Sequence, residues 1–302
     1  MNEIINEIQK LKKETGTVIL AHTYQAPEII ELADITGDSF ALAKKSLEIG
    51  AKRVLMCGVR FMAESVKILS PDTEVILPAP DATCPMAEMI SPERVREYKK
   101  NNPDAVVVAY INTTAALKAE CDVCVTSSSA LKIVGKIDAP EILFIPDKNL
   151  GSFVKEAFPE KNIVLWDGYC PIHAKVTEED VLQAKKLYPD ALLAVHPECE
   201  RDVVKHADMA GSTAEIIDYA LKSTRPVIIG TERGVADYLI PKHPDKKFYR
   251  LCPEKLVCRD MKYTTPENIL AALKNEGGEI IELNEELVKK AKHSIDEMLR
   301  LG

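Results

Sequence analysis

Three cysteines, Cys84, Cys170 and Cys258, follow one another at nearly equal intervals of 86 and 88 residues. Such intervals are typical of internal repeats, which restrict a chain to a few copies of one supersecondary unit. A Ser or Thr stands seven residues after each cysteine and precedes acidic and then apolar residues, as expected of a helix N-cap. We therefore predict three equivalent helices, capped by Ser91, Thr177 and Thr265 and ended by Pro103, Pro189 and Gly277.

An apolar run at three corresponding positions predicts a buried strand in each repeat. The runs are TVILAHTY (17–24), VVVAYIN (106–112) and LLAVHPE (192–198), and they superpose without a gap. Ligands of open α/β sheets bind beyond the carboxyl ends of the strands, so polar residues near these ends are candidate site residues. One equivalent position holds His22, Tyr110 and His196. The position two residues later holds Tyr24, Asn112 and Glu198.

Hydroxyl residues follow at a third corresponding position, where the motifs GDS, TSSS and GST each open an apolar helical pattern. Hydroxyls and free amides at the start of a helix can bind an anion. The candidates are Ser39, Ser127, Ser212 and Thr213. Each copy also has a basic residue after its next strand, which either assists the anion site or is a solvated turn charge; these are Arg60, Lys148 and Arg233. His173, three residues after Cys170, is expected in the same cavity.

The repeat predicts an α/β fold of three three-layer α/β/α units with short parallel sheets, arranged around a pseudo-threefold axis. The expected units are residues 1–83, 84–169 and 170–258. Residues 259–302 carry the beginning of a fourth copy, and we expect this half-unit to pack on the first unit as a terminal cap.

Composition excludes two classes of partner. The net charge is −8, and no Lys/Arg block or aromatic platform indicates nucleic-acid binding. No apolar run approaches the roughly 20 residues that span a bilayer, and the first 14 residues are amphipathic, unlike a signal peptide. We therefore expect a cytoplasmic protein, in which the eight cysteines serve a metal or catalysis and do not form disulfides.

If three like units meet at one axis, the thiols of Cys84, Cys170 and Cys258 converge. Three thiolates suit a cubane iron–sulfur cluster with one open iron, or a zinc site completed by water or His. Either metal can act as a Lewis acid on a small anionic substrate. A Cys₃-zinc lyase or hydrolase and a non-enzymatic binding scaffold are the alternatives. The other cysteines lack counterparts in the other units, and the CxxC of Cys121 and Cys124 occurs in only one.

The order of motifs along the whole chain closely resembles the quinolinate synthase family. The matching motifs are AHTYQ (21–25), GDS (37–39), GVRFMAE (58–64), PDKNLG (146–151), DGYCPIHA (167–174), HPEC (196–199) and GST (211–213). The resemblance implies a transferase of NAD biosynthesis that condenses iminoaspartate with dihydroxyacetone phosphate to quinolinate, losing phosphate and two waters. It also implies an oxygen-sensitive [4Fe–4S] cluster on Cys84, Cys170 and Cys258, and so favours iron over zinc.

The same resemblance implies roles for the other candidates. Glu198 is expected to act as acid and base beside the substrate, Tyr24 to close the site and assist proton transfer, and His196 to join them in catalysis. A transient contact with an aspartate oxidase or dehydrogenase that supplies iminoaspartate is also expected. The residues expected to bind substrate are His22, Ser39, Tyr110, Asn112, Ser127, His173, His196, Glu198, Ser212 and Thr213.

Overall fold

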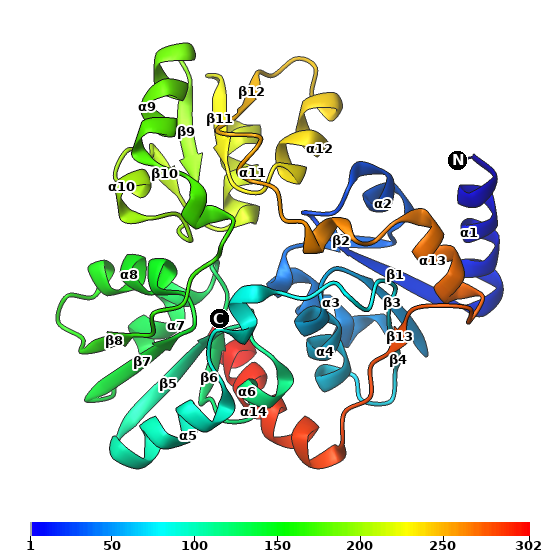
Figure 1. Cartoon of the computed structure of the whole chain (residues 1–302), viewed down its shortest axis with the longest axis horizontal. Coiled ribbons are helices and arrows are strands. Elements are labelled where there is room, and N and C mark those ends of the chain that lie inside the picture. Colours follow the sequence, from blue (N-terminus) through cyan, green and yellow to red (C-terminus); the bar gives the residue numbers. More distant parts are fainter. Residues whose placement is uncertain (1) are drawn as a thin grey trace.

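The computed structural model describes residues 2–302 as an α/β protein whose three sheets are almost wholly parallel (Figure 1). The parallel strands of the sheets have a common order: the first strand of each lies between the second and the third, and the fourth lies beyond the third. The second strand of each sheet is therefore added on one side of the first strand, and the third and fourth are added on the other. Open α/β sheets bind ligands at the point where this direction of addition changes. The predicted α/β class with parallel sheets is confirmed.

The first sheet contains four parallel strands and one short antiparallel strand from the C-terminal region. Its buried strand residues pack against helices on both faces. The strands are β1 (Thr17–His22), β2 (Ile35–Gly37), β3 (Arg53–Cys57), β4 (Glu74–Leu77) and β13 (Glu279–Ile280), and the helices are α1 (Asn2–Thr15), α2 (Pro27–Leu32), α3 (Ser39–Ile49), α4 (Arg60–Leu69) and α13 (Pro266–Leu273).

The second sheet is formed by four parallel strands from the middle of the chain. Its strands are β5 (Ala105–Tyr110), β6 (Val123–Val125), β7 (Glu141–Ile145) and β8 (Ile163–Leu165), with a 3₁₀ turn η1 (Pro85–Glu88) and helices α5 (Pro92–Asn101), α6 (Ala115–Lys118), α7 (Ala130–Lys136) and α8 (Lys148–Ala157).

The third sheet repeats this arrangement. Its strands are β9 (Leu192–Val195), β10 (Met209–Ala210), β11 (Val227–Gly230) and β12 (Phe248–Arg250), with 3₁₀ turns η2 (His173–Lys175) and η3 (Asp260–Lys262) and helices α9 (Glu178–Leu187), α10 (Arg201–Val204), α11 (Thr213–Lys222) and α12 (Gly234–Lys242).

An aspartate that the sequence analysis did not single out occupies the same place in each sheet. Its carboxylate accepts the backbone N–H of a residue in the first strand, 15 residues earlier, and thereby fixes the loop before the second strand. The pairs are Asp34 with Ile19, Asp122 with Val107 and Asp208 with Leu193, each at 2.8 Å.

The predicted caps are confirmed as the N-cap residues of α5, α9 and α13. Thr177 and Thr265 each form a capping box with the residue three positions on, whereas the Ser91 side chain makes no capping hydrogen bond. The hydroxyl motifs differ more. Ser39 and Thr213 are the first residues of α3 and α11, but Ser127 lies in a turn before α7, which begins at Ala130.

The segment 259–302, which we expected to pack on the first unit, divides between two sheets. Helix α13 packs on α1, and β13 pairs with β4 of the first sheet. Helix α14 (Glu285–Leu301) lies mainly against α6 and β6 of the second sheet (Figure 1), because its buried face covers them with Ile295 and Met298. Within residues 2–302, every helix is too short or too polar to cross a membrane.

Candidate active site

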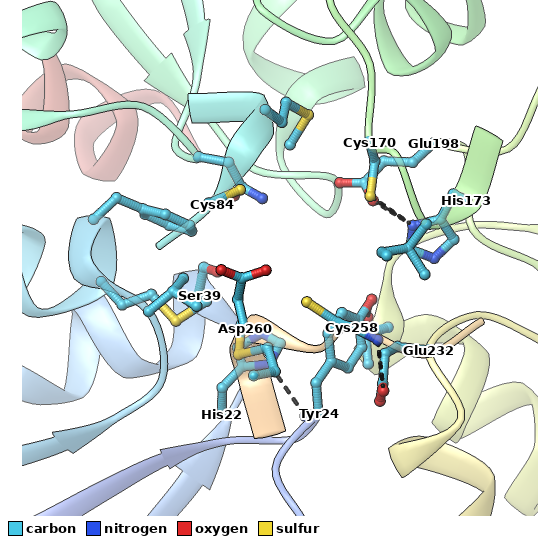
Figure 2. Close-up of a pocket in the computed structure, with 18 of the residues that line it drawn as sticks. His22, Tyr24, Ser39, Cys84, Cys170, His173, Glu198, Glu232, Cys258 and Asp260 are labelled. Atoms are coloured by element: carbon cyan, nitrogen blue, oxygen red, sulfur yellow. Dashed lines mark hydrogen bonds and ion pairs between the residues drawn. The ribbon is translucent and has the colours of Figure 1, made fainter. Parts of the chain in front are cut away.

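A cavity of about 110 Å³ lies where the carboxyl ends of strands from all three sheets come together (Figure 2). Of the residues predicted to take part in catalysis, to bind substrate or to hold metal, all line its walls except Ser212, whose buried side chain instead caps α11. The predicted residues that line it are His22, Tyr24, Ser39, Cys84, Tyr110, Asn112, Ser127, Cys170, His173, His196, Glu198, Thr213 and Cys258.

The thiols of Cys84, Cys170 and Cys258 line this cavity, and their sulfurs face its interior from three directions (Figure 2). Burial raises the pKa of Cys84 and of Cys258 to about 12, and it also raises the pKa of Cys170. These thiols therefore stay protonated at neutral pH unless a metal takes the place of the protons.

The spacing of potential ligands distinguishes two kinds of metal site. In residues 2–302, the only three potential ligands with donor atoms all within 4.8 Å of one another are Cys170, His173 and Glu198. Three thiolates on one zinc ion, each about 2.3 Å from the metal, would lie roughly 3.8 Å apart. Cys84, Cys170 and Cys258 form no such group, so in this structure their three sulfurs do not all lie close enough together to share one zinc ion.

Each cysteine loop is fastened to its sheet by the backbone of the predicted basic residue. The N–H of that residue donates to the carbonyl oxygen two residues before the cysteine: Arg60 to Ala82 at 2.9 Å, Lys148 to Gly168 at 2.8 Å and Arg233 to Leu256 at 2.8 Å. The side chains pair instead with Glu279, Asp167 and Asp237, and none lines the cavity. The interpretation of these side chains as anion ligands is therefore wrong.

Buried carboxylates hold two of the cysteine loops. The N–H of Cys170 donates to Oδ2 of Asp147 at 3.0 Å, and the N–H of Cys258 donates to Oε1 of Glu232 at 3.3 Å. Strand pairing gives the two acids equivalent positions, each two residues beyond the last paired residue of its strand. The first unit has Val59 at this position, where strand pairing ends at Cys57, so the Cys84 loop has no acid at the equivalent position.

Glu198 is buried, with Oε2 2.7 Å from Nδ1 of His173 and 3.6 Å from Nδ1 of His196. Burial alone would raise the pKa of Glu198, but the two histidines and the Tyr110 hydroxyl outweigh it and hold the pKa below its usual value. Glu198 is therefore ionised at neutral pH and can accept a proton.

His22 and His196 are neutral donors. Burial lowers the pKa of His22 to about 3 and that of His196 to about 4. In each ring Nδ1 accepts a backbone N–H two residues later, from Tyr24 at 3.1 Å and from Glu198 at 3.3 Å, so Nε2 carries the proton. Two N–H donors can therefore bind carboxylate or carbonyl oxygens in the cavity.

Thr231, which sequence reasoning missed, joins Tyr24 to His173. The Tyr24 hydroxyl lies 2.9 Å from Oγ1 of Thr231 and 2.9 Å from Oγ1 of Thr213, and Nε2 of His173 lies 3.1 Å from Oγ1 of Thr231. Burial raises the pKa of Tyr24, which keeps its phenol protonated. Thr231 and Glu232 follow β11 as Pro146 and Asp147 follow β7, so the repeat itself was the signal that could have revealed them.

The remaining polar walls are acidic or hydroxylic. Asp38, Glu232 and Asp260 line the cavity, and no Lys or Arg does so among residues 2–302. Asp260 also connects two cysteine loops, because its Oδ1 accepts from the backbone N–H and hydroxyl of Thr83 at 3.3 and 3.4 Å. An anionic substrate would thus meet neutral donors and helix amides in place of cationic side chains.

An α/β protein whose strand ends surround thiols, neutral imidazoles and an ionised carboxylate has the groups of an enzyme that works by acid–base chemistry. The family model described as quinolinate synthetase A protein matches residues 6–300. The chain is 50% identical over 298 residues to a quinolinate synthase of Caldicellulosiruptor bescii, covering 98% of each chain. It is 47% identical over 304 residues to one of Alkaliphilus metalliredigens, covering all of both. A quinolinate synthase of Aquifex aeolicus is 42% identical over 309 residues, with 100% of this chain and 95% of the relative covered. The chain belongs to the quinolinate synthase family and is an enzyme.

Proposed function

We propose that this enzyme condenses iminoaspartate with dihydroxyacetone phosphate, releasing phosphate and two waters to form quinolinate. Membership of the family supports this reaction. The observation that carries the proposal furthest is that Cys84, Cys170 and Cys258 open into the one cavity that also holds Glu198.

We propose further that these three cysteines hold a [4Fe–4S] cluster. Support comes from their free thiols, their shared cavity and a spacing too wide for one zinc ion. When bound, such a cluster with one iron free of protein ligands supplies a Lewis acid that polarises a substrate oxygen.

The proposed roles of the other residues follow from their protonation states. Glu198, ionised and buried, removes a proton from the substrate carbon and returns it to a departing oxygen, a step that positioned carboxylates accelerate roughly 10²–10⁴-fold. Tyr24, with a protonated phenol, donates to a departing oxygen and covers the substrate. His196 orients the substrate beside Glu198 through its Nε2–H.

The proposed substrate-binding groups divide by chemistry. Neutral N–H donors and amides suit carboxylates, and hydroxyls with the free amides at the starts of α3 and α11 suit the phosphate. The buried Oδ1 of Asn112, which has no hydrogen-bond partner in residues 2–302, suits a substrate donor such as the imine N–H. The donors and hydroxyls are His22, Ser39, Tyr110, Ser127, His173, His196 and Thr213, whereas Ser212 would act only through the cap of α11.

We also propose that residues 1–83, 84–169 and 170–258 are three repeated units around a pseudo-threefold axis. The common strand order and the equivalent aspartate and cysteine-loop hydrogen bonds support this arrangement. Transfer of iminoaspartate from an aspartate oxidase or dehydrogenase by transient contact, and a cytoplasmic location, stay predictions from the sequence.

One observation favours a second candidate. The close group of Cys170, His173 and Glu198 could bind a single zinc ion, as in a lyase or hydrolase acting on a small anion. A product assay separates the two: the anaerobic enzyme is given iminoaspartate, generated in place, with dihydroxyacetone phosphate. The proposal predicts quinolinate and phosphate in equal amounts. Release of phosphate without quinolinate would favour the zinc hydrolase, and the absence of both products would exclude the proposed reaction.

A further inference from the structure

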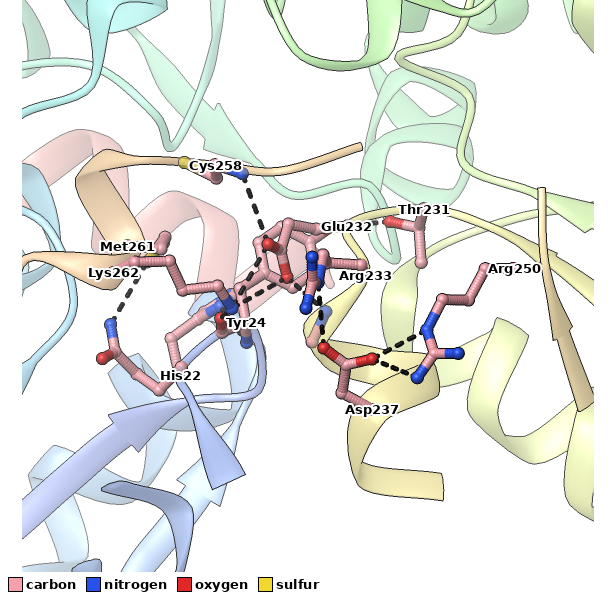
Figure 3. Close-up of polar contacts among 12 residues, drawn as sticks. His22, Tyr24, Thr231, Glu232, Arg233, Asp237, Arg250, Cys258, Met261 and Lys262 are labelled. Carbon is pink, nitrogen blue, oxygen red and sulfur yellow. Dashed lines mark hydrogen bonds and ion pairs between the residues drawn. The ribbon is translucent and has the colours of Figure 1, made fainter. Parts of the chain in front are cut away.

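Glu232 is a buried acid that the proposed mechanism does not use, although it lines the cavity. It follows β11, and its two carboxylate oxygens accept different backbone N–H groups (Figure 3). Oε1 accepts from Cys258 at 3.3 Å and Oε2 from Gly234 at 2.7 Å. One side chain therefore attaches the Cys258 loop to the start of α12.

Lys262 connects this carboxylate to the first sheet. Its Nζ lies 3.3 Å from Oε1 and 3.4 Å from Oε2 of Glu232 and also donates to the backbone carbonyl oxygen of Tyr24 (Figure 3). Tyr24 lies just after β1, whereas Cys258 and Lys262 lie more than 230 residues later. The ammonium group is thus the link between the Tyr24 backbone and the Cys258 loop.

Gly234 shows how closely these groups are packed. A Cβ atom at this position would lie 2.7 Å from Oε2 of Glu232, 2.9 Å from Nζ of Lys262 and 2.9 Å from the carbonyl oxygen of Tyr24. All three distances are shorter than a carbon atom tolerates, so only glycine lets the three groups meet. The neighbouring ion pairs of Asp237 with Arg233 and Arg250 support the same loop but contact neither Tyr24 nor Cys258.

We propose that Glu232 and Lys262 are a positioning pair that fixes the Cys258 loop and the Tyr24 backbone relative to each other. The pair acts through these two residues and takes no part in proton transfer. Its effect on turnover rests on the proposed function, but its effect on the Cys258 loop does not.

The first test measures the Cys258 loop without reference to catalysis. Site-resolved alkylation rates of Cys258 and Cys84 are compared in the metal-free full chain for wild type, Glu232→Gln, Lys262→Met and the control Asp237→Asn. The proposal predicts that Cys258 reacts at least threefold faster in Glu232→Gln and Lys262→Met, while Cys84 changes less than twofold. Asp237→Asn should change neither. Equal acceleration of both cysteines, or of neither, would overturn the proposal.

The second test asks whether Lys262 acts through Tyr24. In the metal-loaded enzyme, Lys262→Met should lower kcat at least tenfold with less than a threefold change in KM, and Lys262→Arg should recover part of the loss. In a Tyr24→Phe background, Lys262→Met should lower kcat less than twofold further, because the effect on Tyr24 is already lost. Full additivity of the two losses would show that Lys262 does not act through Tyr24.

Lys262→Met alone could fail to fold because it leaves the buried Glu232 carboxylate without its cationic partner. The double variant Glu232→Gln/Lys262→Met avoids this and is predicted to keep the selective rise in the alkylation rate of Cys258. A Cys258 rate equal to that of wild type would contradict the proposed positioning role of the pair. If wild type makes no quinolinate, the proposed function fails, while the ratio of Cys258 to Cys84 alkylation still decides the positioning role.

Discussion

Oε2 of Glu198 lies 2.7 Å from Nδ1 of His173, and the same nitrogen lies 3.3 Å from Sγ of Cys170. One imidazole edge thus faces both the carboxylate proposed as acid and base and a thiol proposed as a cluster ligand. Its other nitrogen is held by Thr231. With a cluster bound, this arrangement would place the proposed proton transfer beside the metal that polarises a substrate oxygen.

Glu198→Gln should abolish the acid–base step while leaving the cavity intact, because glutamine has the same shape and no charge. We expect kcat to fall about 10²–10⁴-fold with unchanged iron content and a KM within threefold of wild type. Steady-state quinolinate formation and iron analysis on one preparation check this. A variant with full activity would remove Glu198 from the mechanism.

Cys170→Ser should lose both cluster and activity, because it removes one of the three thiols proposed to hold the cluster. Cys121→Ser is the control: Cys121 is a buried free cysteine that lies after α6, outside the cavity lining. We expect wild-type iron, sulfide and turnover in the control. The reverse pattern would mean that the ligands are misassigned.

Thr231→Val should disconnect Tyr24 from His173 without changing side-chain size much. Loss of a hydroxyl that bonds two buried partners should lower the free energy of unfolding by about 1–3 kcal/mol and kcat by roughly tenfold. Thr73→Val, which removes a hydroxyl bonded to Ala51 far from the cavity, should affect stability alone. Equal kcat values in the two variants would contradict the role of Thr231.

Stability should fall in mild acid because His22 and His196 are buried in neutral form. Their pKa values of about 3 and about 4 lie below the ordinary 6.5, so the unfolded chain binds more protons as the pH drops below 6.5. Each histidine should cost about 2 kcal/mol between pH 7 and pH 5. Urea unfolding of the metal-free chain measures the loss.

The variant His196→Gln provides the control for that pH dependence. It should reduce the difference in unfolding free energy between pH 7 and pH 5 by about 2 kcal/mol, the share that His196 contributes, while His22 remains as a buried neutral histidine. An unchanged difference would show that His196 does not titrate as its burial implies.

Local and repeated features could be predicted from the sequence. The equal intervals between Cys84, Cys170 and Cys258 placed three thiols in one cavity, and the hydroxyl spacing gave the N-caps of α5, α9 and α13. The N-caps could be predicted because a helix cap depends on residues only a few positions apart, and the shared cavity of the thiols could be predicted because the cysteines recur at equivalent positions of a repeat.

Contacts between distant segments that the three repeats do not share could not be predicted. Lys262 meets the Tyr24 carbonyl 238 residues away, and Asp260 meets Thr83 177 residues away. The prediction for the basic turn residues was misleading for a related reason. The feature that repeats is the hydrogen bond of their backbone N–H to the cysteine loop, whereas each side chain pairs with an acid that the other repeats lack, such as Glu279 for Arg60. Side-chain type alone cannot reveal a role of the main chain.

The account depends most on a cluster held by Cys84, Cys170 and Cys258. Iron, acid-labile sulfide and zinc in anaerobically isolated protein, for wild type and for the triple Cys→Ser variant, test this directly. We predict a brown wild-type protein with about four irons and four sulfides per chain, and a colourless variant that has neither. A colourless wild type with one zinc and no sulfide, or iron that persists in the triple variant, would contradict it.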